Sequence, residues 1–120
     1  MAFVPIETDR TADLARPIVR RGAAYADIDG DGDLDVIRTQ VGVQPLLFRN
    51  DQALGHYCLR TKLVGRADNP DAVGAWIKLK AGGITQRRQV MPTRSYLSQV
   101  ALPITSGVGR TDRIDSLAVE

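Results

Sequence analysis

Hydrophobic and polar side chains alternate most regularly in the second half of the chain. Ile77 and Leu79 are expected to point into the core, and the neighbouring lysines outward, because successive side chains of a strand face opposite sides of a sheet. Gly82 and Gly83 follow, and a glycine pair between two strand-like runs is typical of a β-hairpin turn. The returning run, residues 84–90, is polar at most positions, which predicts a hydrated face or a sheet edge.

Other runs with strand-like character predict further strands, and no stretch has a compelling helical pattern. The first half is expected to contain a hairpin over residues 22–40 and a short strand over residues 46–48. The second half is expected to add strands over residues 56–64, 96–102 and 113–119. These elements together predict an all-β fold.

The strongest chemical signal lies in the predicted first hairpin, where aspartates occupy alternate positions: Asp27, Asp29, Asp31, Asp33 and Asp35. Such a density of negative charge repels itself unless a cation lies within it, and Ca²⁺ takes about six to eight oxygen ligands. We expect side-chain ligands from the first, second, third and fifth aspartates and a backbone carbonyl ligand from the fourth. The glycines between them permit the positive φ angles that a tight wrap needs. The alternative is a solvated acidic loop, but the regular spacing favours a calcium site.

The residues around the acidic loop determine which kind of calcium site is expected. An EF-hand needs a glutamate at the twelfth position of its loop and a helix on each side. The twelfth position here is Arg38, and residues 34–39 are β-branched and alternating, which predicts a strand. The sequence therefore predicts a calcium site between two strands rather than an EF-hand.

The residues resemble two families. Asp27 to Asp35, with its flanking strands and the following residues 45–50 (PLLFRN), resembles the calcium loop of an FG-GAP (VCBS) repeat, the blade of an integrin-alpha-type propeller. Three later stretches, residues 63–65, 69–77 and 96–99, resemble the ASPIC/UnbV domain, which follows FG-GAP repeats in secreted proteins. The resemblance implies a β-rich extracellular protein with no established catalytic residues.

Three units follow from this reading of the chain. Residues 1–21 are expected to form an extended N-terminal arm, within which residues 8–13 form a turn or linker. Residues 22–52 are expected to form the FG-GAP-like calcium-binding repeat, and residues 53–120 the ASPIC/UnbV-like domain. The predicted architecture is a calcium-loop hairpin joined to a small antiparallel β-sandwich or barrel-like domain.

Charge and composition exclude several classes of function. Outside the acidic loop, nine acidic residues face 16 basic ones, but no interleaved aromatic residues or recognisable module accompany them, so nucleic-acid binding is not expected. No apolar run approaches the length of a membrane span, and the first residues do not have the pattern of a signal peptide. Cys58 is expected to be a small buried hydrophobe. His56 is close to it, but the sequence shows no third residue that would complete a metal site or a catalytic group.

The resemblance and the lone repeat together predict a function. A propeller blade normally packs against neighbouring blades, which cover its apolar faces and edges. A single uncovered hairpin is only marginally stable in water. The sequence therefore predicts a non-enzymatic, extracellular structural protein that is stabilised by Ca²⁺ and self-assembles with other copies, through strand exchange, into an oligomer or filament. The alternatives are an adhesion module that binds carbohydrate (glycans) or protein, and the C-terminal fragment of a larger propeller protein.

Overall fold

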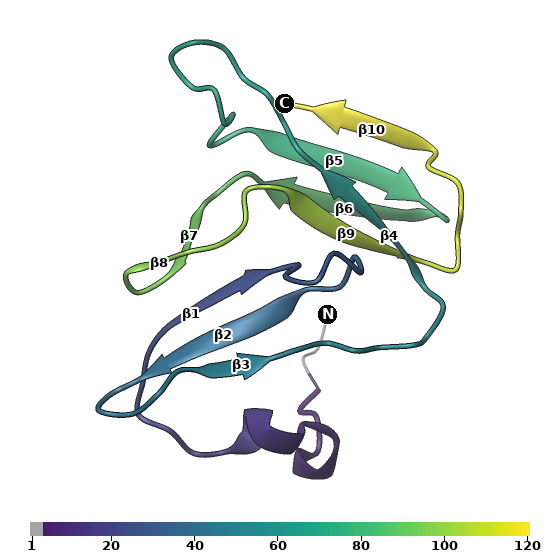
Figure 1. The fold of residues 1–120 in the computed structure, drawn as a ribbon. Coiled ribbons are helices and arrows are strands. Elements are labelled where there is room, and N and C mark those ends of the chain that lie inside the picture. The colour runs from purple at the N-terminus through teal and green to yellow at the C-terminus, as the bar shows by residue number, and fades with distance from the viewer. Residues whose placement is uncertain (1–3) are drawn as a thin grey trace.

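The computed structural model describes residues 4–120, and within them the chain is built from short strands and two 3-10 helices, without an α-helix (Figure 1). The strands form four small antiparallel sheets, ordered β1-β2-β3, β10-β5-β6, β4-β9 and β7-β8. The all-β prediction is confirmed. The elements are η1 (Thr8–Arg10), η2 (Ala12–Ala15), β1 (Arg20–Ala26), β2 (Asp35–Gln40), β3 (Leu46–Phe48), β4 (Tyr57–Thr61), β5 (Trp76–Ala81), β6 (Ile84–Gln89), β7 (Thr93–Ser95), β8 (Ser98–Gln99), β9 (Ile104–Gly109) and β10 (Ser116–Val119).

The sheet β10-β5-β6 contains most of the small hydrophobic core. Ile77 and Leu79 are each only 2% exposed, as the alternating pattern predicts, and Ala81 is buried on the same face of β5. The glycine-pair hairpin joins β5 to β6, and β6 lies at the edge of the sheet, so both predictions for residues 76–90 are confirmed. Val90 and Val100 complete the buried apolar set among the described residues.

The strand β4 lies within the predicted run 56–64 and pairs with β9, a strand that the sequence pattern does not indicate. β9 has the sequence ITSGVG, and its two glycines and its serine give it a weak intrinsic preference for strand. Pairing with β4 stabilises the strand instead, and it leaves Ser106 only 4% exposed. Gln86 Nε2 donates to the carbonyl of Gly107 at 2.6 Å and connects β6 to β9.

The expected strand over residues 96–102 is wrong for most of its length. Tyr96 and Leu97 form the exposed turn of the β7-β8 hairpin, and Leu97 has a φ of +47°, which ends a strand. Only Ser98–Gln99 lies in a strand. The predicted last strand over residues 113–119 is present in shortened form as β10.

The hairpin β1-β2 is joined to the C-terminal part of the chain through β7 and β8 (Figure 1). Ala23 N donates to Ser95 Oγ at 3.2 Å, and Ala101 N donates to the carbonyl of Tyr25 at 3.2 Å. The backbones approach closely at Gly22, where an added Cβ would lie 2.7 Å from the carbonyl oxygen of Tyr96. The first hairpin therefore shares a hydrogen-bonded joint with the residues that follow it.

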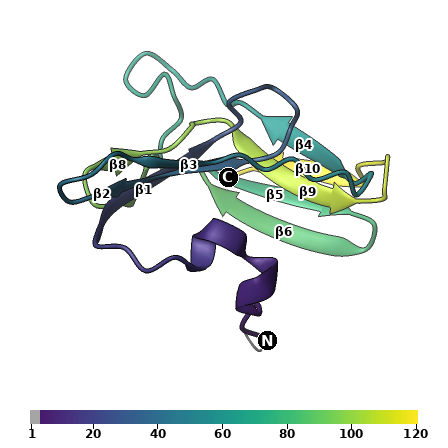
Figure 2. The ribbon, with the colours of Figure 1, turned by 60° about the horizontal axis from the view of Figure 1, so that its bottom comes forward.

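The N-terminal arm is only partly extended. Residues 8–15 form the helices η1 and η2, which lie to one side of the β1-β2-β3 sheet (Figure 2), and β1 already begins at Arg20. Arg38, buried in β2, donates from Nη1 to the carbonyl of Leu14 at 3.0 Å and stacks over the ring of Phe48. The turn expected over residues 8–13 is present as these two short 3-10 helices, which continue to Ala15, and residues 1–3 lie outside the described part.

Candidate metal centre

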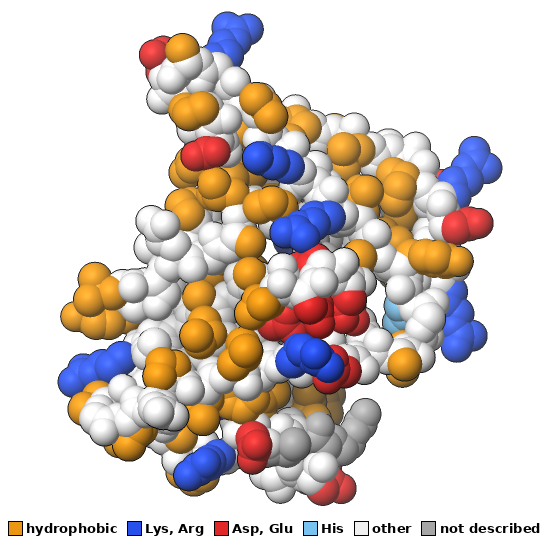
Figure 3. Space-filling view, in the orientation of Figure 1, with side chains coloured by type: hydrophobic (Ala, Val, Ile, Leu, Met, Phe, Trp, Pro, Cys, Tyr) orange, Lys and Arg blue, Asp and Glu red, His pale blue; other side chains and the backbone are white. Residues whose placement is uncertain are grey.

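The loop between β1 and β2 brings three of the five predicted aspartates together. One carboxylate oxygen each from Asp27, Asp29 and Asp31 lies within 4.8 Å of the others. The two glycines of the loop, Gly30 and Gly32, have φ angles of +80° and +95°, which a residue with a side chain adopts only with strain. Figure 3 shows the acidic side chains gathered in the middle of one face, with basic side chains beside them.

Local hydrogen bonds curl the loop around these carboxylates. Asp27 Oδ1 accepts from Gly30 N at 2.8 Å, and Asp31 Oδ1 accepts from Asp33 N at 2.9 Å. Asp29 Oδ1 accepts a longer bond from Asp31 N, at 3.4 Å. Short aspartate side chains favour such local turns because they reach backbone donors two or three residues ahead. The turn keeps the three carboxylates close together.

Asp35 occupies a different place, beneath the loop at the start of β2. Its side chain is buried, with Oδ2 accepting from Ile28 N at 2.9 Å and Oδ1 accepting from Asn50 N at 2.8 Å. These two backbone bonds lower the pKa of the Asp35 carboxyl below its ordinary value. Asp35 therefore ties the loop region to the segment after β3, and each of its oxygens accepts one backbone bond.

Asp33 also lies outside the cluster of three carboxylates. Its Oδ1 accepts from Gln52 Nε2 at 2.6 Å, so its side chain points to the segment that leads into the C-terminal part. The sequence prediction assigned the backbone carbonyl of Asp33, rather than its carboxylate, to the ion. The side-chain placement is compatible with that assignment.

Two arginines that the sequence pattern does not single out contact the cluster. Arg60 Nη1, from β4, lies 2.6 Å from Asp27 Oδ2, and the Asp27 side chain is only 3% exposed. Arg49 Nε lies 3.9 Å from Asp29 Oδ2 and 2.6 Å from Asp51 Oδ1. The bond to Asp51 raises the pKa of the Arg49 guanidinium, so this charge is permanent. Arg60 is 33 residues from its partner, and nothing in the local sequence marks that contact.

The chemistry of the site suits a hard divalent cation. Three converging carboxylates are oxygen donors of the type that Ca²⁺ prefers, and the nearby Arg60 and Arg49 offset only part of the negative charge. Asp27, Asp29 and Asp31 would hold the ion, whereas Asp35 would position the loop from below.

Cys58 is exposed on β4, so the prediction that it is buried is wrong. Its Sγ donates to the carbonyl of Gly32 at 3.3 Å, which brings β4 against the acidic loop. Alternation places Cys58 on the same face of β4 as Arg60, and both side chains contact the acidic loop. His56 precedes the strand.

Comparison with known families identifies the C-terminal part of the chain. Residues 65–120 match the sequence profile of the ASPIC and UnbV family, which supports an ASPIC/UnbV domain over that range. The search of curated proteins gives no match, and neither does the search of solved structures. No helix in the described residues is long and apolar enough to cross a membrane.

Proposed function

We propose that the chain is a non-enzymatic structural module whose first hairpin is stabilised by Ca²⁺ and which associates with further copies of itself. The observation that carries the proposal is the convergence of the Asp27, Asp29 and Asp31 carboxylates at a bend between two strands. An ion at this position removes the repulsion between these carboxylates and links both ends of the bend. Its binding free energy then adds to the stability of the folded state. An extracellular setting, where calcium is abundant, suits such a site.

The Arg60–Asp27 ion pair provides a test of the proposed ion position. Arg60 places a positive charge 2.6 Å from an oxygen of the cluster, and this charge opposes a nearby cation. Arg60→Gln is therefore expected to tighten calcium binding by roughly five-fold, as measured by isothermal titration calorimetry. Without calcium, the same variant is expected to melt at a lower temperature, because it leaves the nearly buried Asp27 carboxylate without its cation.

Arg66→Gln is the matched control for this prediction. Arg66 is exposed and forms no ion pair with any of residues 4–120, so its replacement removes the same formal charge without touching the cluster. Calcium affinity should remain within about two-fold of the unsubstituted protein. Weaker calcium binding in Arg60→Gln than in Arg66→Gln would place the ion away from Asp27.

Support for self-association comes from one face of the β1-β2-β3 sheet. The register pairs Ala24 with Ile37 and Ile37 with Leu47, so these three side chains share one face of the β1-β2-β3 sheet. Ile37 is 39% exposed and Leu47 is 57% exposed. In addition, β3 lies at the edge of its sheet, where unpaired backbone groups accept a further strand. An uncovered apolar face beside an open edge favours contact with a second copy.

Leu47→Lys is expected to weaken self-association by at least about ten-fold, because it places a charge in the centre of this apolar face. Sedimentation velocity over a range of protein concentrations measures the effect. Leu54→Lys is the control, since Leu54 is similarly exposed, at 62%, but lies in the loop after β3. A protein that sediments as a monomer at every concentration, with and without calcium, would contradict the association.

A further inference from the structure

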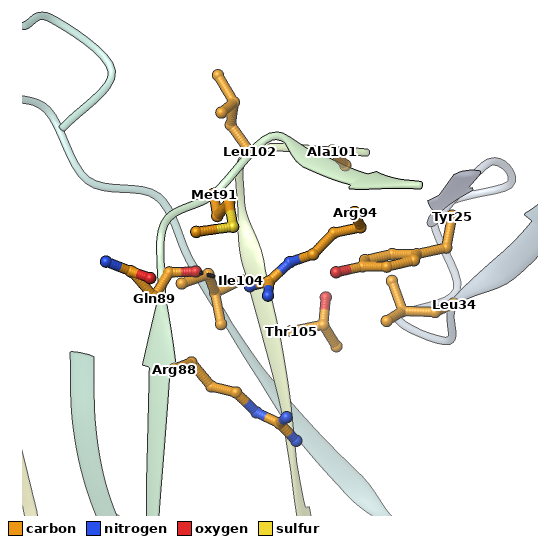
Figure 4. Close-up of a pocket in the computed structure, with 10 residues that line it drawn as sticks. All are labelled: Tyr25, Leu34, Arg88, Gln89, Met91, Arg94, Ala101, Leu102, Ile104 and Thr105. Carbon is orange, nitrogen blue, oxygen red and sulfur yellow. Dashed lines mark hydrogen bonds between the residues drawn. The ribbon is translucent and has the colours of Figure 1, made fainter. Parts of the chain in front are cut away.

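A cavity of about 380 Å³ lies where the first hairpin meets the C-terminal part of the chain (Figure 4). Tyr25 of β1 lines one side, and Arg88 of β6 and Arg94 of β7 enter from the other elements. Thr105 of β9 lies between them, and Met91 is among the apolar side chains that complete the wall. The cavity is large enough for a ligand of one or two rings.

Arg88 is placed unusually for a surface arginine. It pairs directly with Ile77 across the β5-β6 hairpin, so both side chains lie on the same face of the sheet, and that face carries the buried core. Sheets normally keep charged side chains on the opposite, hydrated face, as Lys78 and Lys80 do here. Arg88 itself is exposed on this edge strand, and its side chain borders the cavity.

Arg94 adds a second positive charge to the same space. Its Nη2 donates to the carbonyl of Gln89 at 3.1 Å, which fixes the guanidinium within the cavity. In Figure 4 the Arg94 side chain runs from the side of Tyr25 across to Gln89, and the Arg88 side chain lies below Thr105 with its guanidinium turned away from that of Arg94. Within residues 4–120, neither arginine forms an ion pair with a carboxylate. Two exposed guanidinium groups without a carboxylate partner therefore border the same open hollow.

We propose that this cavity binds a sugar that carries a carboxylate, that is, a hexuronate. A guanidinium pairs with a carboxylate through two parallel hydrogen bonds, so the two arginines provide the charge that selects an acid. The hydroxyl groups of Tyr25 and Thr105 are suited to sugar hydroxyls, and the Tyr25 ring and Met91 provide apolar surface for the face of a sugar ring. Neutral sugars lack the group that the two arginines would bind.

This inference goes beyond the structural role proposed above and does not depend on the calcium ion for its ligand contacts. The cavity shares Leu34 and Tyr25 with the first hairpin, but none of the clustered aspartates lines it. A hexuronate bound there contacts residues on both sides of the joint. Binding is therefore expected to hold the hairpin and the C-terminal part together.

The test is isothermal titration calorimetry. The full chain is titrated with D-galacturonate and, in a parallel experiment, with D-galactose as the matched neutral sugar. We expect saturable binding of galacturonate and at least ten-fold weaker binding of galactose. Arg88→Gln and Arg94→Gln are each expected to weaken galacturonate binding about ten-fold or more. Arg110→Gln is the control; Arg110 is exposed outside the cavity, and its replacement should leave the affinity unchanged.

Two further arms identify the source of the ligand and separate this site from the ion. Tighter binding of tri-galacturonate than of galacturonate assigns the site to an acidic polysaccharide, and equal affinity assigns it to a single sugar. Galacturonate binding that persists in Asp29→Asn supports a site that is independent of calcium. The proposal is overturned by equal affinity for galactose, by unchanged affinity in both arginine variants, by tighter binding of inorganic phosphate, or by no saturation up to about 10 mM.

Discussion

Asp35→Ala is expected to lower the melting temperature by on the order of 10 °C. The substitution removes both acceptors that bind Ile28 N and Asn50 N, and it leaves these backbone donors unpaired below the loop. Thermal unfolding followed by circular dichroism measures the shift. Asp68→Ala is the control, because Asp68 is exposed and makes no side-chain bond within the described residues.

The same carboxylate gives stability a predictable dependence on pH. The two backbone bonds lower the Asp35 pKa, so its contribution to stability is fully present above the ordinary aspartate value of about 4. As the pH falls from there through the lowered folded-state pKa, protonation removes the contribution. The melting temperature of Asp35→Ala should therefore fall less over this window than that of the unsubstituted protein. Parallel curves for the two proteins would contradict the role assigned to Asp35.

Removal of calcium is expected to lower the melting temperature by roughly 10 °C relative to protein at a calcium concentration near one hundred times the dissociation constant. At that ratio, binding contributes about 2.7 kcal/mol to stability, and a domain of this size melts several degrees lower for each kcal/mol lost. The physical reason is the repulsion among Asp27, Asp29 and Asp31, which Arg60 and Arg49 offset only in part. Differential scanning calorimetry with calcium or with EDTA measures the effect.

Asp29→Asn with Asp31→Asn provides the matched variant for chelation. It removes two charges of the cluster while keeping the shape of the side chains, so it should melt at the same temperature with calcium and with EDTA. Magnesium in place of calcium should restore less of the stability, because Mg²⁺ requires stricter geometry and dehydrates reluctantly. If EDTA leaves the melting temperature of the unsubstituted protein unchanged, Arg60 and Arg49 alone are sufficient to offset the negative charge of the loop.

Local pattern predicts the parts of the fold in which neighbouring residues determine the structure. Alternation fixes the inward positions of Ile77 and Leu79, and a glycine pair fixes the turn that follows them. The acidic loop is equally local, since each clustered aspartate is two residues from the next. The hairpin over residues 22–40 and the match of residues 65–120 to the ASPIC and UnbV family agree with these readings.

Contacts between distant segments determine what local pattern does not predict. β9 has two glycines and forms a strand because β4 pairs with it. The Arg60–Asp27 pair joins segments 33 residues apart, and the cavity with Arg88 and Arg94 exists only where the hairpin meets the C-terminal part. The two backbone bonds of Asp35 are likewise invisible in its spacing, because one of them comes from Asn50, after β3.

The central claim is that a metal ion holds the bend between β1 and β2. Calcium titration by isothermal titration calorimetry, with the unsubstituted protein and with the double variant of Asp29 and Asp31, tests it most directly. We predict saturable binding of one ion per chain to the unsubstituted protein and no binding to the variant, because the three converging carboxylates form one cluster. Absence of saturable heat, or equal binding by both proteins, would contradict it.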